Sequence, residues 1–142
     1  MADLGELLLA DTSAWHHSAS PRVSELWRRN LEESRIATTP PVRLEILFSA
    51  RSARDYDEIA RELSAIHQLP CGDEAWGRAL DVQRRLAHVG ALHHRSVQIP
   101  DLLVAAVAEI AGAIVWHYDS DFDRIAEVTG QPMQWLARRG SL

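Results

Sequence analysis

Five acidic residues stand where a carboxylate could take part in chemistry: Asp11, Glu45, Asp101, Asp119 and Asp121. The first follows the apolar run 7–10, and the last two follow the apolar, β-branched run 113–116. Such runs predict buried strands, and α/β sheets bind ligands where the carboxyl ends of their parallel strands meet. If the strand order brings these ends together, the acids converge at one edge of the sheet.

Carboxylates gathered at one edge repel one another and need a cation. Two unit charges 4 Å apart repel by about 4 kcal/mol at an effective dielectric constant near 20. All 15 basic residues of the chain are arginine, so no lysine can neutralise the acids. Hard oxygen ligands with room for water suit Mg²⁺ or Mn²⁺ rather than zinc. Because such ions contact phosphate oxygens and activate water, the acids favour metal-dependent displacement at phosphorus.

Each acid also has a structural interpretation. Asp11, Asp101 and Asp119 could be helix N-caps, a role in which aspartate contributes about 1 kcal/mol. Glu45 lies in the apolar stretch 42–48, on a helix that we expect to be largely packed. A lone carboxylate buried there would be costly unless it were paired or bound to metal.

The surrounding elements predict how the acids are positioned. Short apolar runs predict strands at residues 7–10, 35–39, 67–71, 113–116 and 132–136, the last of them at a sheet edge. Helical patterns are expected to begin at Ser20–Pro21, Pro41, Asp55, Asp73, Pro100–Asp101 and about Asp123, and residues 91–98 form a polar connection. The fold class is α/β, a single three-layer α/β/α domain with a mostly parallel sheet of about five short strands.

Composition narrows the functional classes. The net charge of −5 argues against a nucleic-acid module with a broad basic face, but not against an enzyme that holds phosphates through metal ions. The absence of lysine excludes Schiff-base chemistry and Walker-type phosphate loops. The single cysteine, Cys71, fits a reducing compartment, and no signal peptide or membrane span is recognisable. We therefore expect a cytoplasmic protein without membrane contact.

Four segments, LLLADTSAW, VRLEILFSA, IPDLLVAAVAE and VWHYDSDFDRIAE, resemble in order the acidic motifs of PIN-domain ribonucleases. The similarity is greatest to the VapC toxins of bacterial toxin–antitoxin pairs. The resemblance implies a PIN-like nuclease domain over residues 1–137 and a short tail over 138–142. It also implies catalytic and metal-binding roles for Asp11, Glu45, Asp101 and Asp119, with Asp121 as an auxiliary ligand. Thr12 and Ser13 would help through their hydroxyl groups.

The resemblance also implies an activity and partners. The expected activity is Mg²⁺- or Mn²⁺-dependent endonucleolytic cleavage of RNA (tRNA, rRNA or mRNA) that leaves 5′-phosphate and 3′-hydroxyl ends. The expected assembly is a homodimer inhibited by a VapB-like antitoxin, which lays a helix in an apolar groove and forms a hetero-oligomer. One residue departs from the family pattern, because His117 stands where a threonine or serine is usual. We expect it to hydrogen-bond Asp119, or to weaken the metal site when it becomes cationic near pH 6.5.

Several basic residues could contact RNA phosphates near Asp101: Arg84, Arg85, His93, His94 and Arg95. A solvated surface explains them equally well. Trp15, Trp27 and Trp76 are expected in the core or in a partner groove rather than as platforms for stacked bases. The pairs His16–His17 and His93–His94 lack the further ligands of a zinc site.

Two other functions compete with the nuclease. In a phosphohydrolase of the haloacid dehalogenase type Asp11 would be the nucleophile, but such enzymes usually carry an acid two residues later, where Ser13 stands. A catalytically weak PIN-like module that binds RNA or protein would usually have lost one or more of the acids. All four core positions are filled here.

Overall fold

The computed structural model describes residues 6–142 and contains a parallel sheet between two layers of helices. The sheet order is β3-β2-β1-β4-β5, and its strands are β1 (Leu8–Ala10), β2 (Ile36–Thr38), β3 (His67–Gln68), β4 (Ile114–His117) and β5 (Met133–Trp135). All four strand pairings are parallel. This confirms the predicted fold class and the edge position of the last strand.

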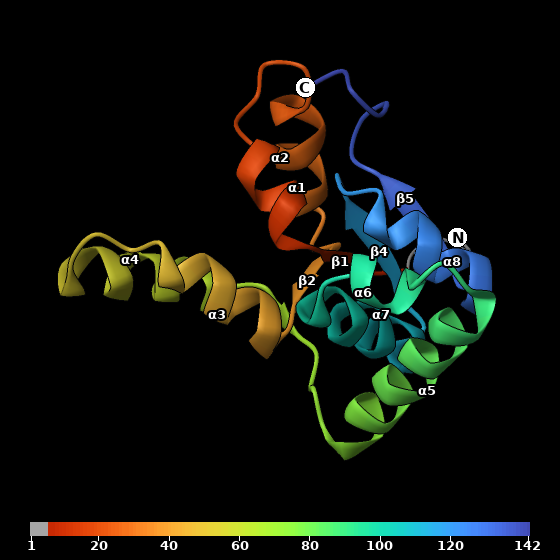
Figure 1. Cartoon of the computed structure of the whole chain (residues 1–142). Coiled ribbons are helices and arrows are strands. Elements are labelled where there is room, and N and C mark those ends of the chain that lie inside the picture. The colour runs from red at the N-terminus through yellow and green to blue at the C-terminus, as the bar shows by residue number, and fades with distance from the viewer. Residues whose placement is uncertain (1–5) are drawn as a thin grey trace.

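The helices are α1 (Thr12–His17), α2 (Ser24–Glu32), α3 (Pro40–Phe48), α4 (Ala53–Ser64), α5 (Asp73–Val89), α6 (His93–Ser96), α7 (Ile99–Ala111) and α8 (Asp121–Thr129). Figure 1 shows α1 and α2 on one side of the sheet and α5 and α7 on the other. It also shows α3 and α4 extending from the body as an arm. No helix within residues 6–142 has the length and hydrophobicity needed to cross a membrane.

Alternate residues of the central strands build the two cores. Leu9 and Val115 face α5, α7 and α8, while Leu8, Ala10 and Trp116 face α1 and α2. This alternation follows from the two-residue period of a strand. Helix α7 supplies an unbroken buried run from Asp101 to Ala108, which confirms the expectation of a helix packed on most sides.

Strands β1 and β4 are neighbours at the point where the chain reverses its direction across the sheet. The chain runs outward from β1 through β2 to β3, then returns to place β4 on the other side of β1. Ala10 lies opposite Trp116, and the Asp11 N–H donates to the Trp116 carbonyl at 2.9 Å. Crevices at such reversal points are the usual ligand sites of open α/β sheets. The chain segments after β1 and β4, which carry Asp11 and Asp119, therefore start side by side.

Some predicted boundaries are wrong. Residues 20–23 form turns, in which the Ser20 carbonyl accepts the N–H groups of Val23 and Ser24, so α2 begins only at Ser24. Ser52 rather than Asp55 caps α4, through a 3.0 Å bond from the Asp55 N–H to Ser52 Oγ.

Other differences lie in the shortest elements. Asp73 is the first residue of α5 and not its cap, and β3 is shorter than expected. Two short helices, α1 and α6, were not predicted, because four to six residues show no clear helical period. Helix α6 follows a sharp turn in which Gly90, Ala91 and Leu92 have φ values of 106°, 53° and 57°.

Three tryptophans join the α1–α2 layer to the sheet. The rings of Trp27 and Trp116 stack with centroids 5.2 Å apart, and Trp15 meets Trp27 edge to face at 4.8 Å. Trp27 is 7% exposed, which agrees with a core role, whereas Trp76 on α5 is 53% exposed. At the end of the chain, Leu142 packs against this core and its N–H donates to the Tyr118 hydroxyl at 2.9 Å.

We predict that Trp27→Ala lowers the free energy of unfolding by about 3–5 kcal/mol, because it opens a cavity beneath the aromatic stack. Tyr56→Ala on α4 is the control and should change stability by less than about 1 kcal/mol, since its ring is 43% exposed. Urea unfolding followed by far-UV circular dichroism measures both. Equal losses in the two variants would contradict this account of the core.

Candidate metal centre

The side chain of Asp11 caps α1 and also lies near the carboxylates of Glu45 and Asp101. Its Oδ2 accepts the Ser13 N–H at 3.0 Å and the Ser13 hydroxyl at 2.7 Å. Its Oδ1 is buried and has no hydrogen-bond partner among the described residues. Burial raises the pKa of Asp11, and the charge of Glu45 adds to this, while the bonds from Ser13 oppose it. The capping and ligand interpretations of Asp11 are therefore compatible, because each uses a different oxygen.

Asp101, Asp119 and Asp121 form a compact group. One carboxylate oxygen of each lies within 4.8 Å of the others. Asp101, in the first turn of α7, is 6% exposed, and its Oδ2 is buried without a partner in the described part of the chain. Burial and the charges of Asp11 and Asp119 raise the pKa of Asp101 to about 9, with a further contribution from Asp121. The metal-free group therefore retains a proton on Asp101 at neutral pH.

Backbone bonds hold this group in place from two helices. The Asp121 N–H donates to Asp119 Oδ1 at 2.9 Å, and Asp121 Oδ2 accepts the Gln98 N–H at 3.3 Å. Asp121 thus links the start of α8 to the residue that precedes α7. Its carboxylate belongs to the compact group on the same footing as that of Asp119, although the family resemblance implied only an auxiliary role.

Glu45 approaches Asp11 from the α3 side. Its Oε1 accepts the Thr12 hydroxyl at 2.8 Å, and its charge contributes to the raised pKa of Asp11. The expectation that α3 is largely packed is wrong, because Leu44 and Phe48 are 68% and 91% exposed and Glu45 itself is half-buried. The hydrogen bond from Thr12 therefore holds Glu45 beside Asp11, and the predicted burial of the Glu45 carboxylate is not needed to explain its position.

The two hydroxyl residues connect the acidic segments. Thr12 orients Glu45, while Ser13 donates to Asp11 and accepts the Tyr118 N–H at 2.9 Å. Ser13 therefore ties the end of β1 to the segment that follows β4.

His117 lies directly beneath the Asp119 segment. Its Nδ1 accepts the Asp119 N–H at 3.2 Å, so the expected contact with Asp119 is made through the backbone and not through the carboxylate. The ring is fully buried between Phe122 and Trp135, with centroids 4.9 and 4.8 Å away. Burial lowers the pKa of His117 to about 4, which keeps the ring neutral near pH 6.5.

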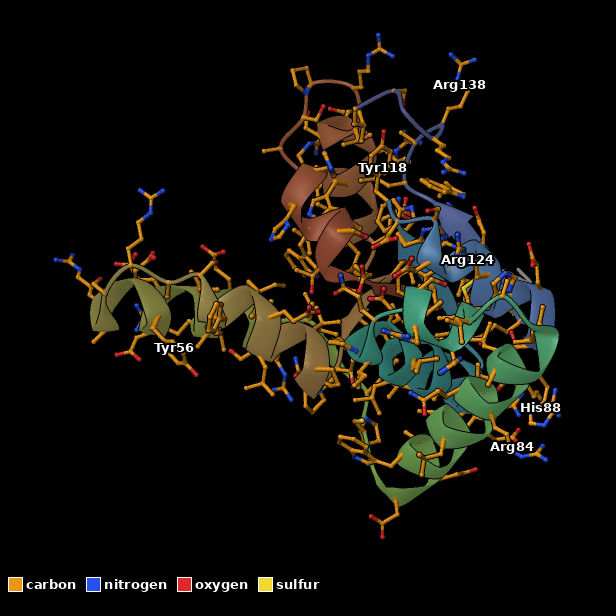
Figure 2. All side chains as sticks on the ribbon, in the orientation of Figure 1. Tyr56, Arg84, His88, Tyr118, Arg124 and Arg138 are labelled. Atoms are coloured by element: carbon orange, nitrogen blue, oxygen red, sulfur yellow. The ribbon has the colours of Figure 1, made fainter. Side chains whose placement is uncertain are left out.

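The structure separates the basic residues that were predicted to contact RNA. His93, His94 and Arg95 lie on α6, immediately before the turn of α7 that carries Asp101. Figure 2 shows Arg84 pointing outward from α5 at the rim of the molecule. Arg85 pairs with Asp81 at 3.4 Å and donates to the Val128 carbonyl at 3.2 Å, at the end of α8 opposite Asp121. Of the five residues, the three on α6 therefore lie just before the start of α7 in the chain, whereas Arg84 and Arg85 lie on α5.

Sequence reasoning overlooked two residues next to these acids. Arg124 lies one helical turn after Asp121 and donates to Ser96 Oγ on α6, which a search for i,i+3 neighbours of the acids could have found. The Gln98 backbone N–H has no signal in the sequence, because its role depends on how α7 meets α8.

The donor set fits a hard divalent cation. The close group consists of carboxylate oxygens, and two of the nearby acids, Asp11 and Asp101, each have a buried oxygen that finds no partner within residues 6–142. Oxygen-only sites suit Mg²⁺ or Mn²⁺. A cation would also offset the burial cost and the repulsion that together raise the pKa of Asp101.

Comparison with known proteins agrees with this geometry. The family model of the PIN domain matches residues 8–128. Ribonuclease VapC18 of Mycobacterium tuberculosis is 54% identical over 132 residues, which cover 93% of this chain and 96% of the relative. Ribonuclease VapC51 of the same organism is 39% identical and covers 94% and 96%. The chain therefore belongs to the PIN-domain family and, within it, to the VapC ribonucleases.

Solved structures share the fold. The crystal structure of DNA bound VapBC from Salmonella typhimurium matches with a TM-score of 0.74 at 20% identity, covering 93% of this chain and 99% of that chain. VapBC-5 from Mycobacterium tuberculosis matches with a TM-score of 0.58 at 24% identity, covering 91% and 96%. At these identities the likeness shows the fold alone.

We predict that the metal-free protein loses stability as pH rises, through Asp101. Its folded pKa of about 9 exceeds the ordinary aspartate pKa of 3.8, so between these two pH values the folded state holds a proton that the unfolded chain has released. Asp101→Asn removes this effect, so its stability advantage over the wild type should grow by up to about 1.4 kcal/mol per pH unit between these values.

Urea unfolding in EDTA at pH 4, 6 and 8 measures the effect. The advantage of Asp101→Asn should shrink toward pH 4, and Asp57→Asn, on the exposed surface of α4, should follow the wild type. A stability difference that does not depend on pH would contradict the proposed proton on Asp101.

Proposed function

We propose that this protein is the toxin of a type II toxin–antitoxin pair, a divalent-metal-dependent endoribonuclease of the cytoplasm. The observation that carries the proposal is the close group of Asp101, Asp119 and Asp121 beside the buried Asp11, at the point where β1 and β4 diverge. Its relatives of 54% and 39% identity are named ribonucleases, and they are matched over nearly their whole length.

The acidic residues would bind the metal ion, and the hydroxyl residues orient two of them. Asp101, Asp119 and Asp121 would hold Mg²⁺ or Mn²⁺, with the free Oδ1 of Asp11 as a further ligand. When bound, such an ion neutralises the acids, contacts the phosphate of the substrate and activates a water for in-line attack. Ser13 orients the Asp11 carboxylate, and Thr12 orients Glu45. Cleavage would leave 5′-phosphate and 3′-hydroxyl ends, as the family resemblance implies.

Helix α6 is the proposed contact for the RNA backbone. It carries His93, His94 and Arg95 and lies shortly before Asp101 in the chain. These side chains can donate hydrogen bonds to phosphate oxygens of an RNA that enters the site. Arg84 and Arg85 are left out of this surface by their position on α5.

The two competing functions are less well supported. A nucleophilic Asp11 needs an exposed oxygen, whereas this side chain is 3% exposed and Ser13 binds its Oδ2. A binding module without activity has no need to keep several carboxylates close together, at the electrostatic cost seen in Asp101.

Two apolar surfaces suit the two expected partners. A groove of about 790 Å³ runs between α2 and α4, and its lining includes Trp15, Trp27, Leu31 and Ile66. We assign it to a helix of a VapB-like antitoxin, because solved relatives are complexes named VapBC and a concave apolar groove accepts an amphipathic helix.

The second surface is a cluster of exposed apolar side chains on α3, α5 and α7: Leu44, Phe48, Trp76, Leu80 and Ile99. It is flatter than the groove, and its hollows of about 300 and 210 Å³ share Trp76, Ile99 and Leu103. Apolar surfaces of this kind are typical of permanent homodimers, so we assign it to a second copy of the chain.

We predict that RNA cleavage requires a divalent ion and the acidic group. Asp11→Asn and Asp101→Asn should lower Mn²⁺-dependent cleavage at least about 100-fold, because losing a metal ligand costs more than losing one of its outer partners. Asp57→Asn is the exposed control. Cleavage of total RNA, with EDTA as the blank, measures the effect.

Expression of the wild type should also arrest growth, and a co-expressed antitoxin should relieve the arrest. Harmless expression, together with no Mn²⁺-stimulated cleavage of any RNA tried, would overturn the proposal.

We predict that the two apolar surfaces can be disabled separately. Leu31→Glu places a charge in the groove and should abolish antitoxin binding while the protein stays dimeric and active. Leu80→Glu, on the flat surface, should give a monomer that still binds the antitoxin. Light scattering and titration with the antitoxin measure both properties. If Leu80→Glu rather than Leu31→Glu lost the antitoxin, the two assignments would have to be exchanged.

A further inference from the structure

Three backbone N–H groups after β4 are each bound by a side chain rather than by the sheet. The Tyr118 N–H donates to Ser13 Oγ at 2.9 Å, and the Asp119 N–H donates to His117 Nδ1 at 3.2 Å. The Asp121 N–H donates to Asp119 Oδ1 at 2.9 Å. The course of this segment, which carries two of the clustered acids, therefore depends on side-chain acceptors.

The bond at His117 repeats a local pattern that carboxylates make elsewhere in the site. Asp11 accepts the N–H of Ser13, and Asp119 accepts the N–H of Asp121, each two residues further along the chain. His117 makes the same contact to the residue two positions ahead, with an imidazole nitrogen in place of an oxygen. An imidazole nitrogen that accepts a hydrogen bond carries no proton, so this ring is neutral, with its proton on Nε2.

Of the two nitrogens of the His117 ring, Nδ1 is the one that makes a hydrogen bond. His117 is fully buried between Phe122 and Trp135, and its Nε2 has no hydrogen-bond partner within residues 6–142. Leaving a donor unpaired inside a protein is unfavourable. A leucine would fill the space without that cost, so packing alone does not explain a histidine here.

The surroundings of His117 hold its ring in one orientation. The Leu136 N–H donates to the His117 carbonyl at 2.7 Å, and Trp135 Nε1 donates to Asp123 at 3.1 Å. Edge strand β5 therefore fixes both the backbone of His117 and one of the two aromatic rings beside it.

We propose that His117 is a positioning residue of the metal site, whose neutral Nδ1 fixes the Asp119 backbone so that its carboxylate points toward Asp101 and Asp121. This inference rests on the proposed metal-dependent function. A neutral acceptor suits the position because an aspartate there would make the same bond but add a negative charge beside several others.

Two substitutions separate positioning from packing. His117→Leu fills the buried space with an apolar side chain but removes the acceptor for the Asp119 N–H. His117→Asn restores an acceptor that can bind an N–H two residues ahead, but it leaves a smaller side chain between the aromatic rings.

The proposal predicts opposite orders in two measurements on the full-length protein. Mn²⁺ binding, followed by electron paramagnetic resonance or calorimetry, should weaken about 10–100-fold in His117→Leu and by less than about threefold in His117→Asn. The melting temperature in EDTA should fall more in His117→Asn than in His117→Leu, because the smaller side chain leaves a cavity.

The outcomes distinguish a failure of the proposed metal site from a failure of the positioning role of His117. A wild type that binds no Mn²⁺ would contradict the proposed metal site itself. A wild type that binds Mn²⁺, with His117→Leu binding it equally well, would overturn the positioning role alone. Losses of Mn²⁺ affinity that simply follow the losses in melting temperature would reduce His117 to a packing residue and overturn the inference as well.

Discussion

Repulsion between carboxylates at the ends of two adjacent parallel strands is the constraint on which the site depends. Strand order places the end of β1 beside the end of β4, and α7 brings a third acidic segment to the same edge. The cost is visible in Asp101, where burial, together with the charges of Asp11 and Asp119, raises the pKa to about 9. A fold that tolerates this cost in the absence of metal has its ligands assembled before the ion arrives, which favours binding.

Hydrogen bonds within the protein reduce this repulsion. In several of the acids, one carboxylate oxygen accepts a nearby N–H or O–H group. Asp11, Asp119 and Asp121 each accept a backbone N–H from a helix start or a loop. Ser13 then joins the β1 and β4 segments, so that they cannot shift independently. His117 belongs to the same arrangement as a neutral acceptor, fixed from behind by β5. The layer of three tryptophans keeps this frame rigid by packing α1 and α2 onto the sheet.

The two partner surfaces use different elements, and the flat surface adjoins the acidic site at Glu45 and Pro100. The groove lies between α2 and α4, and the flat apolar surface covers α3, α5 and α7. Helix α3 contributes Glu45 to the site and Leu44 and Phe48 to the flat surface. Helix α7 likewise carries both Asp101 and Ile99, so self-association and the acidic site are connected through α3 and α7. The antitoxin groove uses neither of these helices.

The sequence alone determined the strand and helix order, the core of α7, and the acids that follow β1 and β4, because hydrophobic period and residue type are local properties. It did not determine the short helices α1 and α6, or the exposure of α3. It also left open which acids form the closest group, since Asp121 joins Asp101 only when α8 meets the start of α7. The role of His117 was decided by the tertiary structure as well. Whether a histidine is a cationic surface group or a neutral buried acceptor depends on what packs around it, and its neighbour Trp135 reaches it only across the edge of the sheet.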